Sequence, residues 1–418
     1  MKKAMIITVG TGKSGEDIAG AICYSIDRER PDYVLFLKTD LSSKLTMPHI
    51  MANPVVNERV IDESVIEDPN DVQAIAKECE DQIRSLIEKG ISPKDIVIDF
   101  TSGTKAMSAG LTVAAINMGV GTLIYISGER GEGGRVIPGT ERAVAIRTNR
   151  IMADLLFHKA VRLFNTYQFD ACIHTLEEAK ALYQAPDFIR RCELLQSLAK
   201  AYGLWDRFDL KGAFSLLKEI REKDLPPQWD LMHIIKGNKE ALYQETTEQF
   251  CPERAVDLLE NARRRGDVEK KYDDAVARLY RLCEYIAQME LNKEGLYRSD
   301  KGKIDTSDVD IERLPSEIRS MFSRYYNERE GKLMLPLYQS FSLLAEVNNS
   351  VGRKFISDEE LSKKLLHARN NSILAHGFGP ISANTYKKMM ISLEGLLQDT
   401  VKDLDKTIKR VKFPKIIS

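Results

Sequence analysis

The pattern of apolar and polar positions divides the chain into a first part with strands and helices and a second part with helical periodicity only. Short apolar runs bounded by turn residues predict strands, and these lie at Met5–Val9, Tyr33–Lys38, Val55–Ile61, Asp95–Phe100, Thr122–Ser127 and Ala143–Thr148. Helical stretches separate several of these runs, among them the amphipathic segment Asp71–Lys89 and a small-residue segment that ends near Met118. Such alternation predicts a parallel α/β sheet covered on both faces.

After Met152 the strand pattern stops, and the middle of the chain contains a weak internal repeat. Residues 160–170 resemble residues 199–209 at an offset of 39 residues, and residues 265–275 echo them once more. Each segment predicts a helix, a short turn and a second helix. The spacing is close to that of tetratricopeptide-like repeats, so we predict a small array of helical hairpins.

The last third of the chain predicts an antiparallel helical bundle. Its expected helices are Tyr272–Leu291, Leu333–Val347, Ser357–His376 and Thr385–Val411, and Arg298–Pro315 is expected to be a surface loop. The pattern as a whole predicts three domains: a Rossmann-like α/β domain at 1–150, an all-α linker at 151–265 and an all-α bundle at 266–418.

One of these predicted helices carries candidate chemistry near its end. Ser357 and Glu360 form an S-x-x-E capping box that would start it, and Gly377 lies just beyond its last residue. Arg369 and His376 are seven residues apart, which places them on nearly the same face, about 10 Å apart along the axis. A permanent cation and a group that titrates near neutral pH suit cleavage of a phosphodiester. The alternative is that both residues only complement the helix dipole.

The first strand ends in a turn, Gly10–Gly15, that admits two interpretations. The turn is a formal G-x-G-x-x-G between a strand and a helix, and Asp40 follows the second strand where a ribose-binding acid would lie. NAD binding is therefore a candidate function. A P-loop is excluded, because Ile7 occupies the position at which that motif needs its first glycine.

A second loop, Asp99–Ser108, also joins a strand to a helix. Its hydroxyls, backbone N–H groups and Lys105 favour an anionic phosphate. One such loop serves a dinucleotide, whereas two indicate a longer phosphate ligand across the carboxyl edge of the sheet. The alternative is that Thr101 and Ser102 only cap the following helix.

These two loops, together with residues 128–130 and 138–142, resemble the CRISPR-associated Rossmann fold, or CARF domain. The resemblance implies that the domain senses cyclic oligoadenylates made by type III CRISPR complexes, with the tetra-adenylate favoured and the hexa-adenylate as the alternative. The ligand-binding residues that it implies are Gly10, Thr11, Gly12, Lys13, Ser14, Thr101, Ser102, Gly103, Thr104, Lys105, Met107 and Arg130.

Arg369 and His376 resemble the R-(4 to 6 residues)-H motif of HEPN ribonucleases, in which a polar residue often follows the Arg, here Asn370. The resemblance implies a single-stranded endoribonuclease with Arg369, Asn370 and His376 as catalytic residues. It also implies metal-independent cleavage, assembly as a homodimer and activation by the cyclic oligoadenylate. Some CARF domains cleave their own activator, and we expect a slow activity of this kind here; the alternative is a pocket that only binds the activator.

The composition is compatible with these expectations. Lys and Arg total 61 against 62 for Asp and Glu, which argues against non-specific coating of nucleic acid. The cysteines form no C-x-x-C pair and the six histidines are scattered, so we expect buried thiols and no metal site. With no signal peptide and no membrane span apparent, we expect a cytoplasmic protein. Two other classes remain open: an NAD(P)-dependent enzyme and a non-catalytic cyclic-nucleotide sensor.

Overall fold

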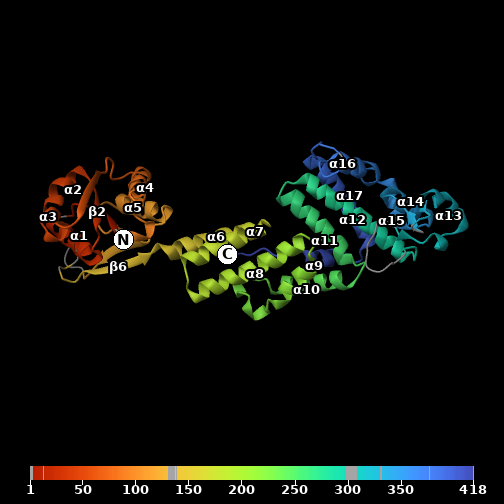
Figure 1. Ribbon diagram of the computed structural model, residues 1–418, viewed down its shortest axis with the longest axis horizontal. Coiled ribbons are helices and arrows are strands. Elements are labelled where there is room, and N and C mark those ends of the chain that lie inside the picture. The colour runs from red at the N-terminus through yellow and green to blue at the C-terminus, as the bar shows by residue number, and fades with distance from the viewer. Residues whose placement is uncertain are drawn as a thin grey trace. The chain divides into compact units, whose positions relative to one another are not determined.

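The computed structural model describes residues 3–12, 14–129, 137, 139–297, 308–329, 332–375 and 377–417 (Figure 1). Its contacts divide the chain into two compact units. The first comprises Met1–Phe157 and Glu178–Ile189, and the second comprises His158–Glu177 and Arg190–Ser418. In the described part of the chain, no helix has both the length and the apolar character needed to cross a membrane.

The first unit is built on a six-stranded sheet with the strand order β3-β2-β1-β4-β5-β6. The strands are β1 (Ala4–Val9), β2 (Tyr33–Lys38), β3 (Val60–Val65), β4 (Ile96–Asp99), β5 (Thr122–Ser127) and β6 (Arg142–Arg147). The first five are parallel, whereas β6 pairs antiparallel with β5. The predicted α/β sheet is confirmed, but an all-parallel sheet is wrong, because the edge strand β6 runs antiparallel to β5.

The third strand begins later than its apolar run suggested. Residues Pro54–Val56 form a 3₁₀ turn, which starts where the Asn53 side chain accepts a hydrogen bond from the Val55 N–H at 3.1 Å. The strand predicted at Val55–Ile61 is therefore displaced to Val60–Val65. Local capping chemistry outweighed the apolar character of the two valines.

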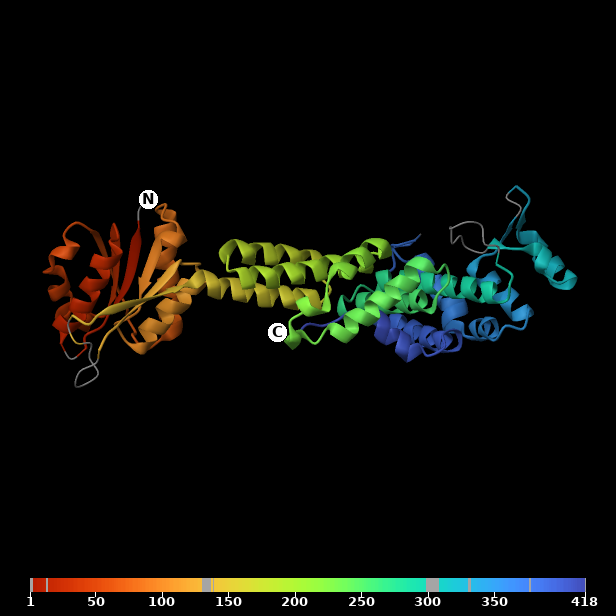
Figure 2. The same cartoon turned by 90° about the horizontal axis from the view of Figure 1, so that it is seen from below.

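Alternating residues of the central strands fill two separate cores. Ala4 and Ile6 of β1 face α4 and α5, whereas Met5, Ile7 and Val9 face α1 and α3. Figures 1 and 2 show these helix pairs on opposite faces of the sheet. The helices of this unit are α1 (Gly15–Glu29), α2 (Asp40–Leu45), α3 (Met47–Met51), α4 (Val72–Glu88) and α5 (Lys105–Asn117). A strand buried on both faces reads as a continuous apolar run, which explains why the sequence revealed β1 so clearly.

Helices make up most of the remaining chain, and α6 to α8 contribute to both units. The helices are α6 (Thr148–Asn165), α7 (Phe169–Leu182), α8 (Pro186–Asp206), α9 (Leu210–Glu219), α10 (Met232–Thr247), α11 (Pro252–Arg263), α12 (Tyr272–Lys293), α13 (Ser316–Phe322), α14 (Leu337–Glu346), α15 (Ser350–Ser357), α16 (Leu366–Asn371), α17 (Ala383–Thr400) and α18 (Leu404–Val411). A small sheet, β7-β9-β8, consists of β7 (Asp308–Val309), β8 (Tyr326–Asn327) and β9 (Lys332–Met334).

Three expectations for the bundle need correction. The helix expected at Leu333–Val347 begins at Leu337, because β9 occupies the preceding residues. The helix expected at Thr385–Val411 is interrupted before Asp403, which adopts a left-handed conformation with φ 59°. The loop expected at Arg298–Pro315 contains β7 and a 3₁₀ turn, while residues 298–307 lie outside the described residues.

The repeated helical hairpins share one turn geometry. Tyr167 and Phe208 both adopt left-handed φ values, 64° and 63°. Each follows the end of a helix, and the backbone hydrogen bonds Tyr167 N to Phe164 O and Phe208 N to Trp205 O are equivalent. The two turns are therefore offset by 41 residues, and the sequence alignment at 39 residues was out of register by two.

The residues after α18 pack into the second unit through an aromatic anchor. Phe413 is only 4% exposed, and its ring lies 4.9 Å from Tyr202 and 5.1 Å from Trp205. The Arg264 guanidinium lies 3.8 Å from the same ring centroid. Asn165 then holds Ile416 by two hydrogen bonds of 2.8 Å, one to its N–H and one to its carbonyl. This C-terminal strap, residues 412–417, ties the helical middle to the bundle.

We expect Phe413→Ala to destabilise the second unit by about 3–5 kcal/mol, because truncation of a buried aromatic ring leaves a cavity. The measurement is urea unfolding followed by tryptophan fluorescence, since Trp205 contacts the ring. The control is Ile417→Ala, whose side chain is 77% exposed, and which should leave the midpoint unchanged. Equal midpoints for both variants would show that the strap does not stabilise the fold.

Candidate functional site

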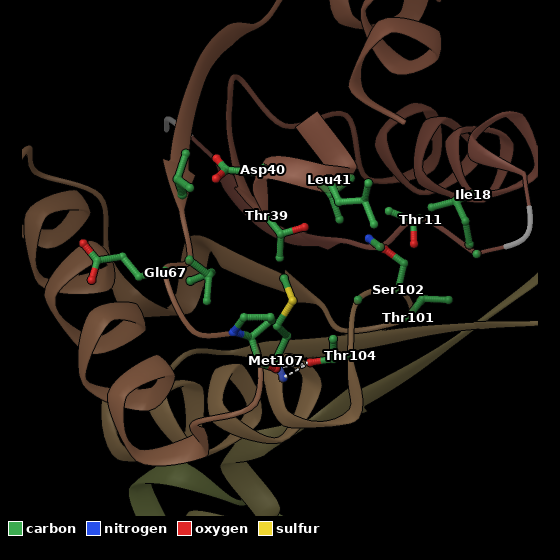
Figure 3. Close-up of a pocket in the computed structure, with 17 residues that line it drawn as sticks. Thr11, Ile18, Thr39, Asp40, Leu41, Glu67, Thr101, Ser102, Thr104 and Met107 are labelled. Atoms are coloured by element: carbon green, nitrogen blue, oxygen red, sulfur yellow. Dashed lines mark hydrogen bonds between the residues drawn. The ribbon is translucent and has the colours of Figure 1, made fainter. Parts of the chain in front are cut away.

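The carboxyl edge of the sheet contains a pocket of about 740 Å³ (Figure 3). The strand order reverses between β1 and β4, and doubly wound sheets bind their ligands at this switch point. The pocket is lined by Val9, Gly10, Thr11, Gly12, Ile18, Thr39, Asp40, Leu41, Val65, Ile66, Glu67, Pro69, Thr101, Ser102, Gly103, Thr104 and Met107. Four neighbouring strands, β1 to β4, therefore contribute to one site.

A direct backbone approach joins the two glycine loops at the centre of this pocket. A Cβ atom on Gly10 would lie 2.5 Å from the Gly103 nitrogen, too close for any side chain. Gly103 also has φ +93°, a conformation that L-residues rarely adopt. Thr46 secures the first loop by donating a hydrogen bond to the Gly10 carbonyl at 2.8 Å. Glycine is thus required at both positions for the loops to meet.

The hydroxyl groups of the second loop hold the loop itself. Ser102 is buried, donates to the Thr8 carbonyl and accepts from the Gly10 N–H at 3.3 Å. Thr101 accepts from the Ile126 N–H at 2.8 Å. Thr104 caps α5 by accepting from the Met107 N–H at 3.1 Å. These contacts favour a structural role for the hydroxyls and leave backbone N–H groups to meet a ligand.

Asp99 lies beneath this loop and fixes its first residue. Its Oδ1 accepts hydrogen bonds from the Thr101 N–H at 2.9 Å and from the Thr101 hydroxyl. The side chain is only 1% exposed, and burial is the main cause that raises the pKa of its carboxyl. Asp99 is therefore a positioning residue inaccessible to a ligand.

The second candidate site surrounds Arg369 on the short helix α16. The Arg369 guanidinium lies 4.9 Å from the ring centroid of Tyr280 on α12, within the range of a cation–π contact. Its NH1 donates to the Asn370 side chain at 3.1 Å. Glu284, one turn beyond Tyr280, has a raised pKa because of burial, which the charges of Arg281 and Arg369 partly oppose. These side chains form a polar, half-buried face.

The helix around Arg369 differs from the predicted one at both ends. Ser357 ends α15, and Asp358 provides the cap by accepting from the Glu360 N–H at 2.9 Å. A π-helical turn, Glu360–Leu365, then leads into α16. The helix stops at Asn371, whose carbonyl accepts from the Gly379 N–H at 3.0 Å. A continuous helix to residue 376 is therefore wrong, and the helical spacing of Arg369 and His376 does not apply.

A groove of about 570 Å³ runs along the other side of α16 and the start of α17. It is lined by Lys363, Lys364, His367, Ala368, Asn371, Gly379, Pro380, Ile381, Ser382 and Thr385. Its two lysines pair at the surface with Glu359 at 2.9 Å and Glu360 at 2.6 Å. Exposed pairs of this kind are weak, so the lysines remain able to bind another anion.

Comparison with known proteins agrees with this architecture. A family model described as the Csm6 HEPN domain matches residues 243–400. The chain is 25% identical over 362 residues to a CRISPR system endoribonuclease Csm6 from Thermus thermophilus, covering 79% of this chain and 73% of that protein. This chain is thus similar to CARF–HEPN proteins of the Csm6 family, and residues 243–400 match their HEPN domain.

A solved Csm6 structure from Enterococcus italicus has the same fold over 99% of this chain and 100% of its own, with a TM-score of 0.61 and 15% identity. That protein was solved bound to cyclic hexa-2′-fluoro-hexa-dAMP. The matches extend beyond one domain, so the Csm6 architecture covers both units of this chain. The boundaries at residues 150 and 265, however, remain predictions.

The sheet-edge pocket gathers eight of the predicted ligand residues: Gly10, Thr11, Gly12, Thr101, Ser102, Gly103, Thr104 and Met107. Ser14 and the exposed Lys105 are not among the lining residues. Lys13 and Arg130 lie outside the described residues. The binding roles of all twelve stay predictions.

Sequence analysis missed the opposite wall of the pocket, where Thr39, Asp40, Leu41 and Glu67 lie at the ends of β2 and β3 (Figure 3). Their place after two strands was the available signal, but only Asp40 was considered, as part of an NAD site. Of the predicted catalytic set, Arg369 and Asn370 are adjacent, and His376 lies outside the described residues. Tyr280 and Glu284 carried no sequence signal, because only the fold brings α12 to α16.

Thiols and metal ligands can be compared with the expectations as well. All six cysteines are buried, as predicted: Cys23, Cys79, Cys172, Cys192, Cys251 and Cys283. Across the described ranges, no three His, Cys, Asp or Glu side chains are grouped so as to hold a metal ion.

We expect Gly10→Ala to lower the thermal unfolding midpoint, because the added methyl group would meet the Gly103 nitrogen. Overpacking of this kind costs about 1–3 kcal/mol. The matched control is Gly20→Ala in α1, where nothing lies within 4 Å of the new Cβ. The control should be neutral or stabilising by up to about 1 kcal/mol, as expected for alanine in a helix. Equal midpoints would contradict the close contact between the two loops.

Proposed function

We propose that this chain is an endoribonuclease of type III CRISPR defence that binding of a cyclic oligoadenylate activates. The observation that carries the proposal is the presence, in one chain, of a two-loop pocket at the sheet switch point and an Arg-bearing bundle matched by the Csm6 HEPN model. The Csm6 relatives support the substrate and the activator. Neither an NAD(P)-dependent enzyme nor a non-catalytic cyclic-nucleotide sensor accounts for both the two-loop pocket and the Arg-bearing bundle.

The pocket supports an extended phosphate ligand. Among the described residues, the N–H groups of Thr11, Gly12 and Gly103 donate no recorded hydrogen bond, and they line the meeting point of the loops. Backbone N–H groups in such turns bind anions well. We favour a ring of four or six adenylates. The Enterococcus italicus relative was solved with a six-nucleotide analogue, which favours the hexa-adenylate.

The chemistry we propose for the bundle needs no metal. His376 takes a proton from the RNA 2′-hydroxyl or gives one to the leaving 5′-oxygen. The 2′-oxygen attacks the adjacent phosphorus and the P–O5′ bond breaks, giving a 2′,3′-cyclic phosphate and a 5′-hydroxyl. Arg369 stabilises the charge on the phosphorane, and Asn370, which accepts its hydrogen bond, helps to orient it. The Tyr280 ring limits the rotamers of the guanidinium.

The groove beside α16 supports single-stranded RNA as the substrate. Lys363 and Lys364 line it from the π-helical turn that leads into α16, and His367 lines it from α16 itself, the helix of Arg369. Their surface pairs with glutamates can exchange for phosphates at little cost. We propose that the RNA backbone lies here as it approaches Arg369.

We also propose a homodimer. One Arg and one His make a small active site, and a two-fold arrangement of two bundles would provide two of each. A cyclic ligand with repeated units suits a two-fold pair of pockets for the same reason of symmetry.

We expect the purified chain to cleave single-stranded RNA when cyclic hexa- or tetra-adenylate is added, with activity unchanged by EDTA. His376→Ala should lower the rate by about 10²–10⁴-fold as a lost proton-transfer group, and Arg369→Ala by about 10²–10³-fold as lost charge stabilisation. The assay is gel analysis of labelled RNA, with mass spectrometry of the cyclic phosphate ends.

The matched control is His233→Ala, an exposed histidine of α10, which should cleave at the wild-type rate. Activity that disappears with EDTA would contradict the metal-independent mechanism. Full activity in both the Arg369 and His376 variants would show that RNA cleavage does not depend on these two residues and would contradict the proposed catalytic site.

We further propose that the pocket slowly opens its own activator. Among the described residues no histidine lines it, so cleavage would depend on holding each 2′-oxygen in line with its phosphate. His376→Ala protein incubated with labelled ring should therefore yield linear fragments ending in a cyclic phosphate over hours. Gly10→Ala, which separates the two loops, should abolish this conversion. Recovery of the intact ring after prolonged incubation with excess protein would make the pocket a sensor only.

A further inference from the structure

The two walls of the sheet-edge pocket differ in charge. The wall formed after β1 and β4 presents glycines and hydroxyl residues, and the carboxylate of Asp99 is buried beneath the loop. The wall formed after β2 and β3 presents the exposed side chains of Asp40 and Glu67 (Figure 3). Within the described residues, neither carboxylate has a recorded hydrogen bond or ion pair. One wall thus offers backbone N–H donors, whereas the two carboxylates of the other wall can only accept.

This separation orients a nucleotide ligand. Carboxylates repel the phosphates of a polyanion, so the phosphates belong on the wall of Thr11, Gly12 and Gly103. The carboxylates of the acidic wall favour binding only where the ligand presents hydrogen-bond donors to them, because an ionised carboxylate can only accept a hydrogen bond. In a cyclic oligoadenylate those donors are the ribose 2′-hydroxyls and the adenine amino groups.

The local structure around Asp40 suits a contact with a ribose 2′-hydroxyl. Thr39 and Ser42 form a reciprocal capping box, with the Thr39 N–H donating to the Ser42 hydroxyl at 2.9 Å and the Ser42 N–H donating to Thr39 at 3.2 Å. Ser42 is fully buried, so the backbone of Asp40 is anchored while its side chain stays at the pocket. An acid directly after the second strand is where doubly wound sheets bind a ribose 2′-hydroxyl.

We propose, as a deepening of the proposed function, that Asp40 accepts a hydrogen bond from a 2′-hydroxyl of the cyclic oligoadenylate and selects ribose over deoxyribose rings. Glu67 belongs to the same wall but contributes only charge. The 2′-hydroxyl is the group that distinguishes RNA-type from DNA-type ligands. The pocket would then bind cyclic deoxynucleotides less tightly even where their bases and phosphates fit.

The test compares cyclic hexa-adenylate with its 2′-deoxy counterpart by calorimetric titration of the full chain and two matched variants. Wild type should bind cyclic hexa-adenylate about tenfold more tightly than its 2′-deoxy counterpart, because one hydrogen bond to a charged acceptor is lost with the 2′-hydroxyl. Asp40→Ala should reduce that ratio to about threefold or less, since the acceptor is gone. Glu67→Ala removes the same charge from the same pocket, so it should bind both rings more tightly and keep the tenfold ratio.

The outcomes separate this inference from the function on which it rests. Suppose that wild type binds cyclic hexa-adenylate and that Asp40→Ala keeps the wild-type ratio of affinities for the two cyclic ligands. Asp40 then does not bind the 2′-hydroxyl, and the inference is overturned. Contact of Asp40 with the adenine amino group would give that result too, because both rings carry the group. If Glu67→Ala lowers the ratio of the two affinities as much as Asp40→Ala does, the preference depends on charge alone, and the inference about Asp40 is overturned as well. If neither ring binds wild type, the proposed activator is wrong.

Discussion

The direct approach of the Gly10 and Gly103 backbones is the constraint on which the sheet-edge site depends. A methyl group on Gly10 would meet the Gly103 nitrogen at 2.5 Å, so the two loops can meet only as glycines. That contact closes the switch point between β1 and β4 and turns two separate strand ends into one binding surface. The buried Ser102 hydroxyl then locks the loops together by bonding to both Thr8 and Gly10. The position of every N–H group that could hold a phosphate follows from this arrangement.

The sequence was sufficient to predict the loops but not the use of their side chains. Glycines after buried strands predict tight turns in which the backbone can be closely approached, because glycine adopts conformations that other residues rarely do. The hydroxyls of Thr101, Ser102 and Thr104 have many uses, and the structure commits each of them to a backbone partner of the protein itself. The acidic wall stayed hidden for a related reason. Asp40 and Glu67 are ordinary surface residues in the sequence, and only the order of β2 and β3 in the sheet brings them to the pocket.

The helix of Arg369 shows where periodicity stops being informative. The S-x-x-E pattern at Ser357 suggested a cap, but Asp358 one residue later is a better acceptor and caps the helix instead. The π-helical turn at Glu360–Leu365 inserts a residue into the helical repeat, and such turns recur at functional sites. The positions of the apolar residues in the sequence do not reveal that insertion. Consequently the sequence proposed Arg369 as a candidate on a helix whose bounds were wrong. Its contact with the Tyr280 ring became apparent only from the packing of α12 against α16.

Within the second unit, the buried charge of Arg264 explains why the C-terminal strap matters to the bundle. Arg264 is 4% exposed and pairs with Asp206 at 2.9 Å and Asp257 at 3.4 Å, so α8 and α11 share one cation. A buried ion pair is stable only while water is excluded and every partner is in place. Phe413 supplies that exclusion by covering the guanidinium with its ring. Because the strap continues to Asn165 at the end of α6, a shift of α6 would disturb the cover over Arg264 as well as the chain that follows. The helical middle is therefore coupled to the bundle through two physical routes, and only one of them is covalent.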